Sequence, residues 1–286
     1  MKNTLRIAIQ KSGRLSDQSV KLINECGIQF NNGKSRLRAV SQNFPAEFLF
    51  LRDDDIPGYV EDGVADLGIV GENEMVEKGK DVELIKKLGF SKCRLSLAIP
   101  RDKPYEGIHY FRDKNIATSY TRILEQFLKD NSINAQIHEI SGSVEIAPSI
   151  GLADAVCDIV SSGSTLLSNG LKEVETIFHS EAVLIGNHQS VSEKKALIHQ
   201  LVFRINSVQA GKGNKYILLN APEEATANIV DLLPGMRSPT IVPLAMPGWN
   251  SIHSVVKEDQ FWEVIEKLRE AGAEGILVVP IEKMIV

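Results

Sequence analysis

The stretch GLADAVCDIVSSGSTLLSNG, residues 151–170, changes character at its centre. Its apolar run, residues 155–160, is typical of a buried strand. Five small and mostly hydroxylic residues follow, Ser161-Ser162-Gly163-Ser164-Thr165, and a second apolar run then begins. A buried strand that ends in a small polar loop and enters a helix is the repeating unit of an open α/β sheet. The stretch therefore predicts a fold class and also a place for a ligand.

A second stretch repeats this pattern. GVADLGIVGENEM, residues 63–75, matches residues 151–166 when a two-residue insertion is allowed. Each has an Ala-Asp pair, an apolar strand and a polar loop that enters a helix. Two lobes built alike would direct these loops into a shared cleft, because ligands of open α/β sheets lie beyond the carboxyl ends of the strands. The match is short, and chance similarity is the alternative.

Apolar runs alternate with helical stretches through the first 211 residues, which predicts a parallel or mixed α/β sheet. The expected strands are residues 5–9, 47–52, 65–71, 93–100, 115–118, 135–140, 155–160 and 180–186. The expected helices are residues 16–26 with Ser16 as the N-cap, 56–61, 121–129 and 192–211. Because residues 101–111 are rich in turn formers, we place a boundary there. Lobe I is then residues 1–100 and 183–211, and lobe II is residues 101–182.

The remainder, residues 212–286, has the pattern of a separate small domain. It contains a strand, a helix that starts near Pro222, two strands joined at Pro247-Gly248, a second helix and a last strand. The order β-α-β-β-α-β is the signature of a ferredoxin-like domain. The predicted fold class is α/β, with a two-lobed core and this domain at its end.

Composition excludes several classes of function. The 286 residues are 43% hydrophobic and 24% charged, with a net charge of −5 and basic residues scattered along the chain. Such a chain has no electrostatic footprint for nucleic acid, although it can bind a nucleotide locally. Cys26, Cys93 and Cys157 lie too far apart in sequence to indicate a disulfide framework or a zinc site. The N-terminal apolar run is too short for a signal peptide or a membrane span, so we expect a cytoplasmic protein without a membrane partner.

The hydroxyl loop suits a phosphate monoester. Gly163 lets the backbone approach an anion closely, and the N–H groups at a helix start lack intrahelical partners. Acids such as Asp158 nearby would repel phosphate unless the ligand also carries hydroxyls or a metal ion. A phosphorylated ribose offers hydroxyls to carboxylates, and its diphosphate can carry Mg²⁺. The alternatives are a serine-rich surface turn that caps a helix, and acids that lie in solvent.

Three motifs taken together closely resemble the ATP phosphoribosyltransferases, the first enzymes of histidine biosynthesis. They are EIAPSIGLADAVCDIVSSGSTLLSNGLKEV, FLFLRDDDIPGYVEDGVADLGIVGEN and KSGRL. The resemblance runs from Leu5 to about Ile281 and includes PGMRSPTIVPL near the end, which is typical of the long, histidine-regulated form. It implies a core of two lobes like a periplasmic binding protein. It also implies a Mg²⁺-dependent condensation of N1 of ATP with C1 of phosphoribosyl pyrophosphate, with release of pyrophosphate.

The resemblance also implies roles for residues. Those for phosphoribosyl pyrophosphate are Glu145, Asp154, Asp158, Ser161, Ser162, Gly163, Ser164 and Thr165. Those for ATP are Lys11, Gly13, Arg14, Arg52, Asp53, Asp54 and Glu72. Lys11, Arg14 and Asp158 are implied as catalytic through charge and orientation, and Mg²⁺ is expected on the substrate rather than in a protein cage. The alternative for Asp53–Asp55 is helix capping, and for Lys11 and Arg14 a solvated loop.

The C-terminal domain implies feedback inhibition by histidine between subunits of a homo-oligomer, with dimers converting to hexamers. The implied inhibitor residues are Asn220, Met236, Ser238, Thr240 and Gly275. Asn220 stands where some members have aspartate, so we expect weaker histidine inhibition. Two other functions remain open from the residues alone. One is a non-catalytic two-lobed sensor of a small anion, and the other is a phosphoribosyltransferase for a different base.

Overall fold

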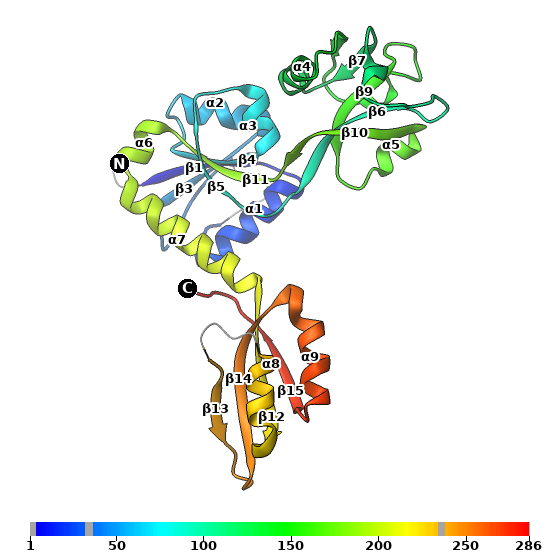
Figure 1. Ribbon diagram of the computed structural model, residues 1–286. Coiled ribbons are helices and arrows are strands. Elements are labelled where there is room, and N and C mark those ends of the chain that lie inside the picture. The colour runs from blue at the N-terminus through cyan, green and yellow to red at the C-terminus, as the bar shows by residue number, and fades with distance from the viewer. Residues whose placement is uncertain (1–3, 32–36, 234–237, 286) are drawn as a thin grey trace. The chain divides into compact units, whose positions relative to one another are not determined.

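The computed structural model describes residues 4–31, 37–233 and 238–285. The chain divides into two compact units (Figure 1). The first unit consists of residues 1–21 and 28–198, and the second consists of residues 22–27 and 199–286. Within the described part of the chain, no helix is both long and apolar enough to cross a membrane.

The first unit contains a six-stranded sheet in the order β2-β3-β1-β4-β11-β5. β1 pairs in parallel with β3 and β4, and β11 pairs antiparallel with β4 and β5. Parallel strands need cover on both faces, which explains why β1 and β4 are apolar almost throughout. The strands are β1 (Leu5–Gln10), β2 (Arg38–Val40), β3 (Ala46–Leu51), β4 (Leu67–Gly71), β5 (Glu83–Lys87) and β11 (Ala182–Gly186). The helices are α1 (Arg14–Glu25), α2 (Ile56–Glu61), α3 (Glu72–Lys78) and α6 (His188–Glu193), with a 3₁₀ turn η1 (Asp53–Asp55).

A second sheet of the same unit has five strands in the order β10-β6-β9-β7-β8. β7 pairs in parallel with β8 and β9, and β6 pairs antiparallel with β9 and β10. Apolar side chains of α4 cover one face, and those of α5 and the segment around Val144 cover the other. The strands are β6 (Cys93–Pro100), β7 (Asn115–Thr118), β8 (Gln136–Glu139), β9 (Ala155–Val160) and β10 (Leu171–Ser180). The helices are α4 (Thr121–Asp130) and α5 (Ser164–Ser168), with 3₁₀ turns η2 (Ile108–Phe111) and η3 (Val144–Ile146).

Apart from the additional edge strand β2, the two sheets have the same topology. In each, a central strand (β1 or β7) lies between two parallel neighbours. Beyond one of them (β4 or β9) comes an antiparallel strand (β11 or β6), and then a strand antiparallel to that one (β5 or β10). β4 and β9 hold the same place in this order, and they are the strands of the two repeated stretches of sequence. The short repeat is therefore confirmed as a pair of equivalent strands.

Two predictions about boundaries are wrong. β6 lies in the second sheet, between β9 and β10, so the lobe boundary expected at residue 100 falls earlier. The chain crosses between the sheets at residues 88–92 and again at residue 181 (Figure 1). The turn-rich residues after β6 instead connect two strands of one sheet. Ser16 is not an N-cap, because α1 begins at Arg14 and Ser16 lies buried inside it.

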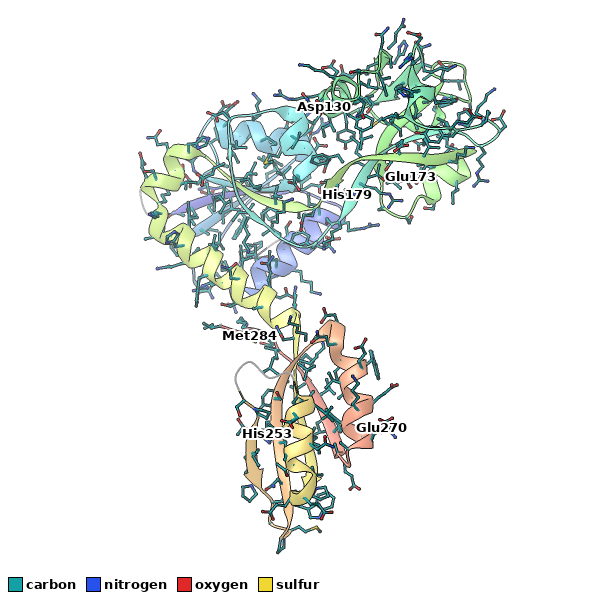
Figure 2. The ribbon with its side chains drawn as sticks, viewed as in Figure 1. Asp130, Glu173, His179, His253, Glu270 and Met284 are labelled. Carbon is teal, nitrogen blue, oxygen red and sulfur yellow. The ribbon has the colours of Figure 1, made fainter. Side chains whose placement is uncertain are left out.

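The second unit contains a four-stranded antiparallel sheet in the order β13-β14-β12-β15. With its helices on one face, this is the ferredoxin-like arrangement that the sequence predicts. Ile217 and Ile252 belong to the core under the helices. His253 (Figure 2) follows Ile252 on β14, and its Nδ1 lies 3.0 Å from Tyr216 Oη. The elements are α7 (Lys195–Lys212, shared with the first unit), β12 (Asn214–Pro222), α8 (Thr226–Leu232), β13 (Thr240–Pro243), β14 (Trp249–Lys257), α9 (Phe261–Glu270) and β15 (Glu274–Pro280).

Candidate active site

The carboxyl ends of β1, β3 and β4 meet at one edge of the six-stranded sheet, which we call the first edge. The N–H of Lys11, directly after β1, donates to the carbonyl of Leu51 at the end of β3, at 2.8 Å. Gly13 follows with φ of +96°, and Arg14 then opens α1. The side chains of Lys11 and Arg14 are exposed. The first edge therefore presents two cations to solvent.

The carboxyl ends of β7, β8 and β9 form the corresponding second edge of the other sheet. Here β9 ends in Ser161–Thr165, which we call the β9 loop. Gly163 has φ of +79°, a conformation that costs other residues about 1–2 kcal/mol. Ser162 Oγ and Ser164 Oγ are 3.0 Å apart, and both side chains are exposed. The structure thus brings the predicted loop residues together, with Gly163 making the turn.

Asp158 and Glu145 are brought together beside this loop. Asp158 lies in the second half of β9 and is half-buried, and Glu145 lies in η3. Burial raises the pKa of Asp158 most, and the carboxylate of Glu145 raises it further, against a hydrogen bond from the N–H of Ile159 at 2.7 Å. A pair of carboxylates that repel one another in this way is suited to hydroxyl donors or to a cation.

Asp154 does not join this group, contrary to the sequence prediction. It precedes β9, at the opposite end of the strand from the loop. Its Oδ2 accepts from the backbone N–H of Asn115 at 2.9 Å, and its Oδ1 lies 3.9 Å from Lys114 Nζ. Asp154 therefore fixes the start of β7 beside the start of β9.

Three of the expected ATP residues are engaged in ion pairs. Glu72 opens α3, but its Oε2 lies 2.8 Å from Nζ of Lys87 on β5. Arg52 Nε lies 3.3 Å from Asp54 Oδ1, directly after β3. Asp53 begins η1, directly before Asp54.

A buried polar network that the sequence gave no reason to expect joins the two edges. Ser180 Oγ donates to Asn73 Oδ1 at 2.7 Å and accepts from Asn73 N at 3.0 Å, and Asn73 Nδ2 donates to Tyr120 Oη at 3.4 Å. Burial raises the pKa of Tyr120 most, followed by the carboxylate of Glu74, and Asp158 and Asp53 add to it. Asn73 follows β4 and Tyr120 follows β7, so the hydrogen bond between them joins the carboxyl ends of the two sheets.

Glu77 of α3 caps α4, which belongs to the other sheet. Its Oε1 accepts from the N–H of Arg122 at 2.9 Å and from Thr121 Oγ1 at 3.2 Å, and its Oε2 accepts from the N–H of Ile123 at 3.1 Å. These are the donors that a helix start leaves unpaired. One carboxylate of α3 therefore makes three hydrogen bonds to the start of α4.

Replacing Glu77 with alanine should lower the free energy of unfolding by about 1–2 kcal/mol, because it removes a three-donor cap. Urea denaturation of purified protein measures the change. Glu125→Ala, at an exposed position within α4, is the matched control and should have a much smaller effect. Equal losses in the two variants would show that Glu77 does not cap α4 in solution.

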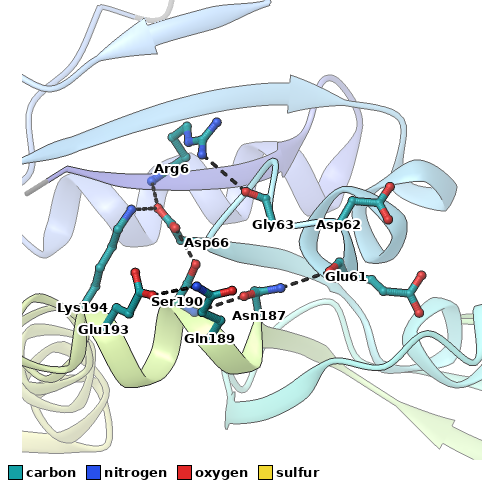
Figure 3. Close-up of a pocket in the computed structure, with 10 residues that line it drawn as sticks. All are labelled: Arg6, Glu61, Asp62, Gly63, Asp66, Asn187, Gln189, Ser190, Glu193 and Lys194. Atoms are coloured by element: carbon teal, nitrogen blue, oxygen red, sulfur yellow. Dashed lines mark hydrogen bonds and ion pairs between the residues drawn. The ribbon is translucent and has the colours of Figure 1, made fainter. Parts of the chain in front are cut away.

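A polar cavity of about 950 Å³ lies at the opposite, amino-terminal edge of the six-stranded sheet (Figure 3). Asp66 stands between Lys194 Nζ at 2.6 Å, Ser190 Oγ at 2.7 Å and the N–H of Arg6 at 2.7 Å. The buried carboxylate of Asp66 therefore connects β1 to α6 and to the residue that follows α6. The cavity is lined by Arg6, Glu61, Asp62, Gly63, Asp66, Asn187, Gln189, Ser190, Glu193 and Lys194. None of them is a predicted site residue.

Comparison with known families decides between the interpretations that the residues left open. Residues 52–207 match the family ATP phosphoribosyltransferase, and residues 211–283 match the HisG C-terminal domain. The chain belongs to the ATP phosphoribosyltransferase family. The resemblance inferred from the three motifs is thereby confirmed, and the non-catalytic sensor is not favoured.

Relatives of the ATP phosphoribosyltransferase family support this assignment over the whole chain. The protein of that name from Cytophaga hutchinsonii is 60% identical over 285 residues, covering 100% of both chains, and that from Bacteroides thetaiotaomicron is 58% identical over 282 residues, covering 99% of this chain and 100% of the other. The ATP phosphoribosyl transferase (HisG:HisZ) complex from Thermotoga maritima contains a chain with a TM-score of 0.60 at 26% identity, covering 71% of this chain and 98% of that one. A periplasmic sulfonate-binding protein from Methylobacillus flagellatus shares the fold, with a TM-score of 0.50 at 14% identity, covering 71% and 67% of the two chains.

The ATP phosphoribosyltransferase family resemblance also gave five inhibitor residues, and four of them lie in the described part of the second unit. Asn220 lies on β12 and Gly275 on the neighbouring strand β15. The two are close, because a Cβ atom added to Gly275 would lie 3.5 Å from Nδ2 of Asn220. Thr240 begins β13, two strands away from β12, and Ser238 is exposed just before it. Met236 lies outside the described residues.

Proposed function

We infer that this chain is an ATP phosphoribosyltransferase and catalyses the first step of histidine biosynthesis. Its family membership carries the activity. For the place of the reaction, the supporting observation is the buried hydrogen bond from Asn73, which follows β4, to Tyr120, which follows β7, because it brings the carboxyl ends of the two sheets together. Ligands of open α/β sheets lie at such edges.

The β9 loop is the proposed site of phosphoribosyl pyrophosphate. Its backbone N–H groups and the exposed hydroxyls of Ser161, Ser162, Ser164 and Thr165 would bind the 5-phosphate. Asp158 and Glu145 would accept hydrogen bonds from the ribose hydroxyls, which relieves the repulsion between the two carboxylates. α5 has only five residues, so local N–H groups rather than a helix dipole have to supply the attraction.

The first edge is the proposed site of ATP. Lys11, Gly13 and Arg14 would bind its phosphates, with Arg52 and Asp53 at the rim. In the reaction, N1 of ATP forms a bond to C1 of the ribose as the bond from C1 to the diphosphate oxygen breaks, and the electron pair leaves with pyrophosphate. Lys11 and Arg14 would stabilise that departing charge. Orientation and charge then account for catalysis without a nucleophilic side chain.

Mg²⁺ fits this proposal as a partner of the substrate. In the described part of the chain, no three His, Cys, Asp or Glu side chains are gathered to hold a metal ion. Asp158 and Glu145 do offer carboxylate oxygens, the ligands that Mg²⁺ prefers together with substrate phosphates. The ion would neutralise the diphosphate as it leaves.

The test is turnover of purified protein with ATP, phosphoribosyl pyrophosphate and Mg²⁺, followed by pyrophosphate release and by the absorbance of the adduct. We expect turnover with ATP and none with other bases or after chelation of Mg²⁺. Turnover with another base alone would indicate a different phosphoribosyltransferase. Binding of the donor without turnover would indicate a sensor.

Histidine regulation is a further part of the proposal. The ferredoxin-like domain with Asn220 and Gly275 on neighbouring strands supports it. Molecular mass in solution, measured with and without histidine, tests the expected conversion of dimers to hexamers. An unchanged mass would argue against that part of the proposal.

Asn220→Asp should tighten histidine inhibition about fivefold, because an ionised acceptor binds a ligand's ammonium or imidazolium more strongly than an amide does. The inhibition constant, measured at saturating substrates, reports the change. Ser251→Asp, across the strand pair from Asn220, is the control for added negative charge. An inhibition constant that stays the same in Asn220→Asp would remove Asn220 from the site.

A further inference from the structure

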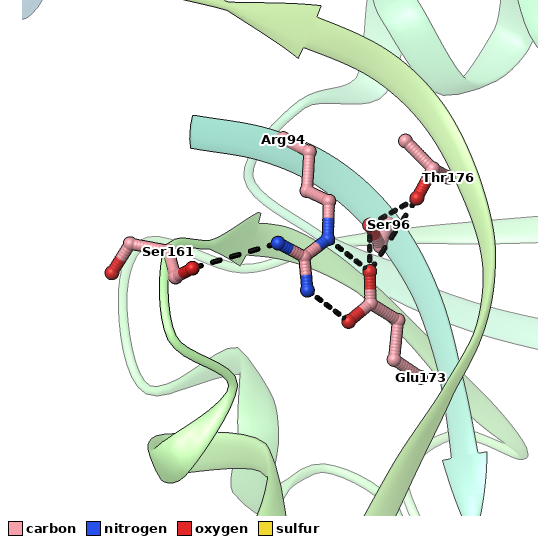
Figure 4. Close-up of polar contacts among 5 residues, drawn as sticks. All are labelled: Arg94, Ser96, Ser161, Glu173 and Thr176. Carbon is pink, nitrogen blue, oxygen red and sulfur yellow. Dashed lines mark hydrogen bonds and ion pairs between the residues drawn. The ribbon is translucent and has the colours of Figure 1, made fainter. Parts of the chain in front are cut away.

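Arg94 and Glu173 form an ion pair beside the start of the β9 loop. Arg94 lies on β6, opposite Val160 at the end of β9, and Glu173 lies on β10. Arg94 Nε and Nη2 donate to the two carboxylate oxygens of Glu173, each at 2.5 Å (Figure 4). The two planar groups therefore meet in the bidentate geometry that only arginine provides.

Other groups hold Glu173 in place. Ser96 Oγ, fully buried on β6, donates to Glu173 Oε1 at 2.8 Å, and Thr176 Oγ1 lies 3.4 Å from the same oxygen. Arg94 is the main cause of the lowered pKa of Glu173, so this carboxylate stays ionised. The register of β10 shifts between Glu173 and Glu175, an irregularity of the kind that re-aims a side chain.

The third nitrogen of the guanidinium reaches the β9 loop. Arg94 Nη1 donates to the carbonyl of Ser161 at 3.5 Å (Figure 4). Ser161 is the first residue of the loop, and Glu173 follows α5 in the chain. One guanidinium thus binds both ends of residues 161–173, the segment that contains the loop and α5.

We propose that Arg94 is a positioning residue for the β9 loop, fixing the Ser161 backbone so that the loop can receive the 5-phosphate of phosphoribosyl pyrophosphate. This inference rests on the proposed function of the loop. The side chains of Arg94 and Glu173 are 33% and 24% exposed, and ion pairs this accessible contribute little to overall stability. The pair instead determines the geometry of the β9 loop, because the third contact of the Arg94 guanidinium is with the carbonyl of Ser161 in that loop.

Arg94→Gln and Arg94→Lys test the proposal through steady-state kinetics. We expect the KM for phosphoribosyl pyrophosphate to rise about tenfold or more in both, because neither side chain makes all three contacts. The KM for ATP should stay within about twofold, since the first edge is untouched. Hydrogen exchange should become faster at residues 161–170 in both variants. Arg112→Lys, on the same lobe and hydrogen-bonded to His109, is the control and should change neither KM.

Glu173→Gln separates positioning from direct binding. If Arg94 positions the loop, loss of its ionised partner raises the KM for phosphoribosyl pyrophosphate in the same direction as Arg94→Gln. A lower or unchanged KM in Glu173→Gln, together with a raised one in Arg94→Gln, would mean that Arg94 binds the donor itself and would overturn the proposal. Unchanged KM and exchange in all variants would also overturn it. Absence of turnover in the unaltered protein would instead reject the proposed function.

Discussion

Gly163→Val should lower kcat/KM for phosphoribosyl pyrophosphate about 100-fold, a loss of the size seen when a charge-binding backbone donor is misplaced. Gly163 has φ of +79°, and a β-branched residue there is a strained outlier. A Cβ would meet only Val160 Cγ1 at 3.8 Å, so the obstacle is the backbone conformation and not a clash. The loop would relax into another conformation, and its N–H groups would no longer point at one phosphate.

Gly151→Val is the matched control for this result. Gly151 has φ of +76°, with nothing within 4 Å of an added Cβ, and it precedes the other end of β9. Both variants should therefore lose a similar amount of stability, about 1–2 kcal/mol, in urea denaturation. Only Gly163→Val should lose affinity for the donor, as measured by kinetics or calorimetry. Equal kinetic losses in the two variants would assign the effect to general strain and count against the loop as the phosphate site.

The sequence predicts strands better than it predicts which strands meet. β9 and its loop, the repeat in β4 and the ferredoxin-like order follow from local patterns, and the structure confirms them. β6 was recognised as a strand but assigned to the wrong lobe, since its partners β9 and β10 lie more than fifty residues away. Periodicity within a strand contains no information about such pairing.

The candidate site shows the same limit at the level of single residues. Asp154 and Asp158 are four residues apart, which looks close in sequence. In an extended strand that separation spans about 13 Å, so Asp154 lies before the start of β9 while Asp158 lies in its second half. Tyr120 and Glu77 were missed for the converse reason, because the contacts of Tyr120 with Asn73 and of Glu77 with α4 join residues 44–47 positions apart.

Lys194→Met should lower the free energy of unfolding of the first unit by about 3 kcal/mol, the lower end of the range for breaking a buried ion pair. The side chains of Asp66 and Lys194 are only 3% and 14% exposed, and Nζ lies 2.6 Å from Oδ2. Without the ammonium, Asp66 would be a buried carboxylate with no counter-charge. It would keep its hydrogen bonds from the N–H of Arg6 and from Ser190 Oγ, which limits the loss.

Lys80→Met makes the same chemical change in an ion pair that is much more exposed. Lys80 Nζ lies 2.8 Å from a carboxylate oxygen of Glu61, but the two side chains are 42% and 30% exposed and water screens the pair. Urea denaturation should therefore leave the midpoint of Lys80→Met almost unchanged while that of Lys194→Met falls clearly. Both variants should retain the catalytic constants of the unaltered protein, because the two pairs lie away from the carboxyl edges. If the two midpoints fell equally, the larger stabilisation expected from the Asp66–Lys194 ion pair could not be due to its burial. Other contacts would then stabilise the amino-terminal edge of the sheet.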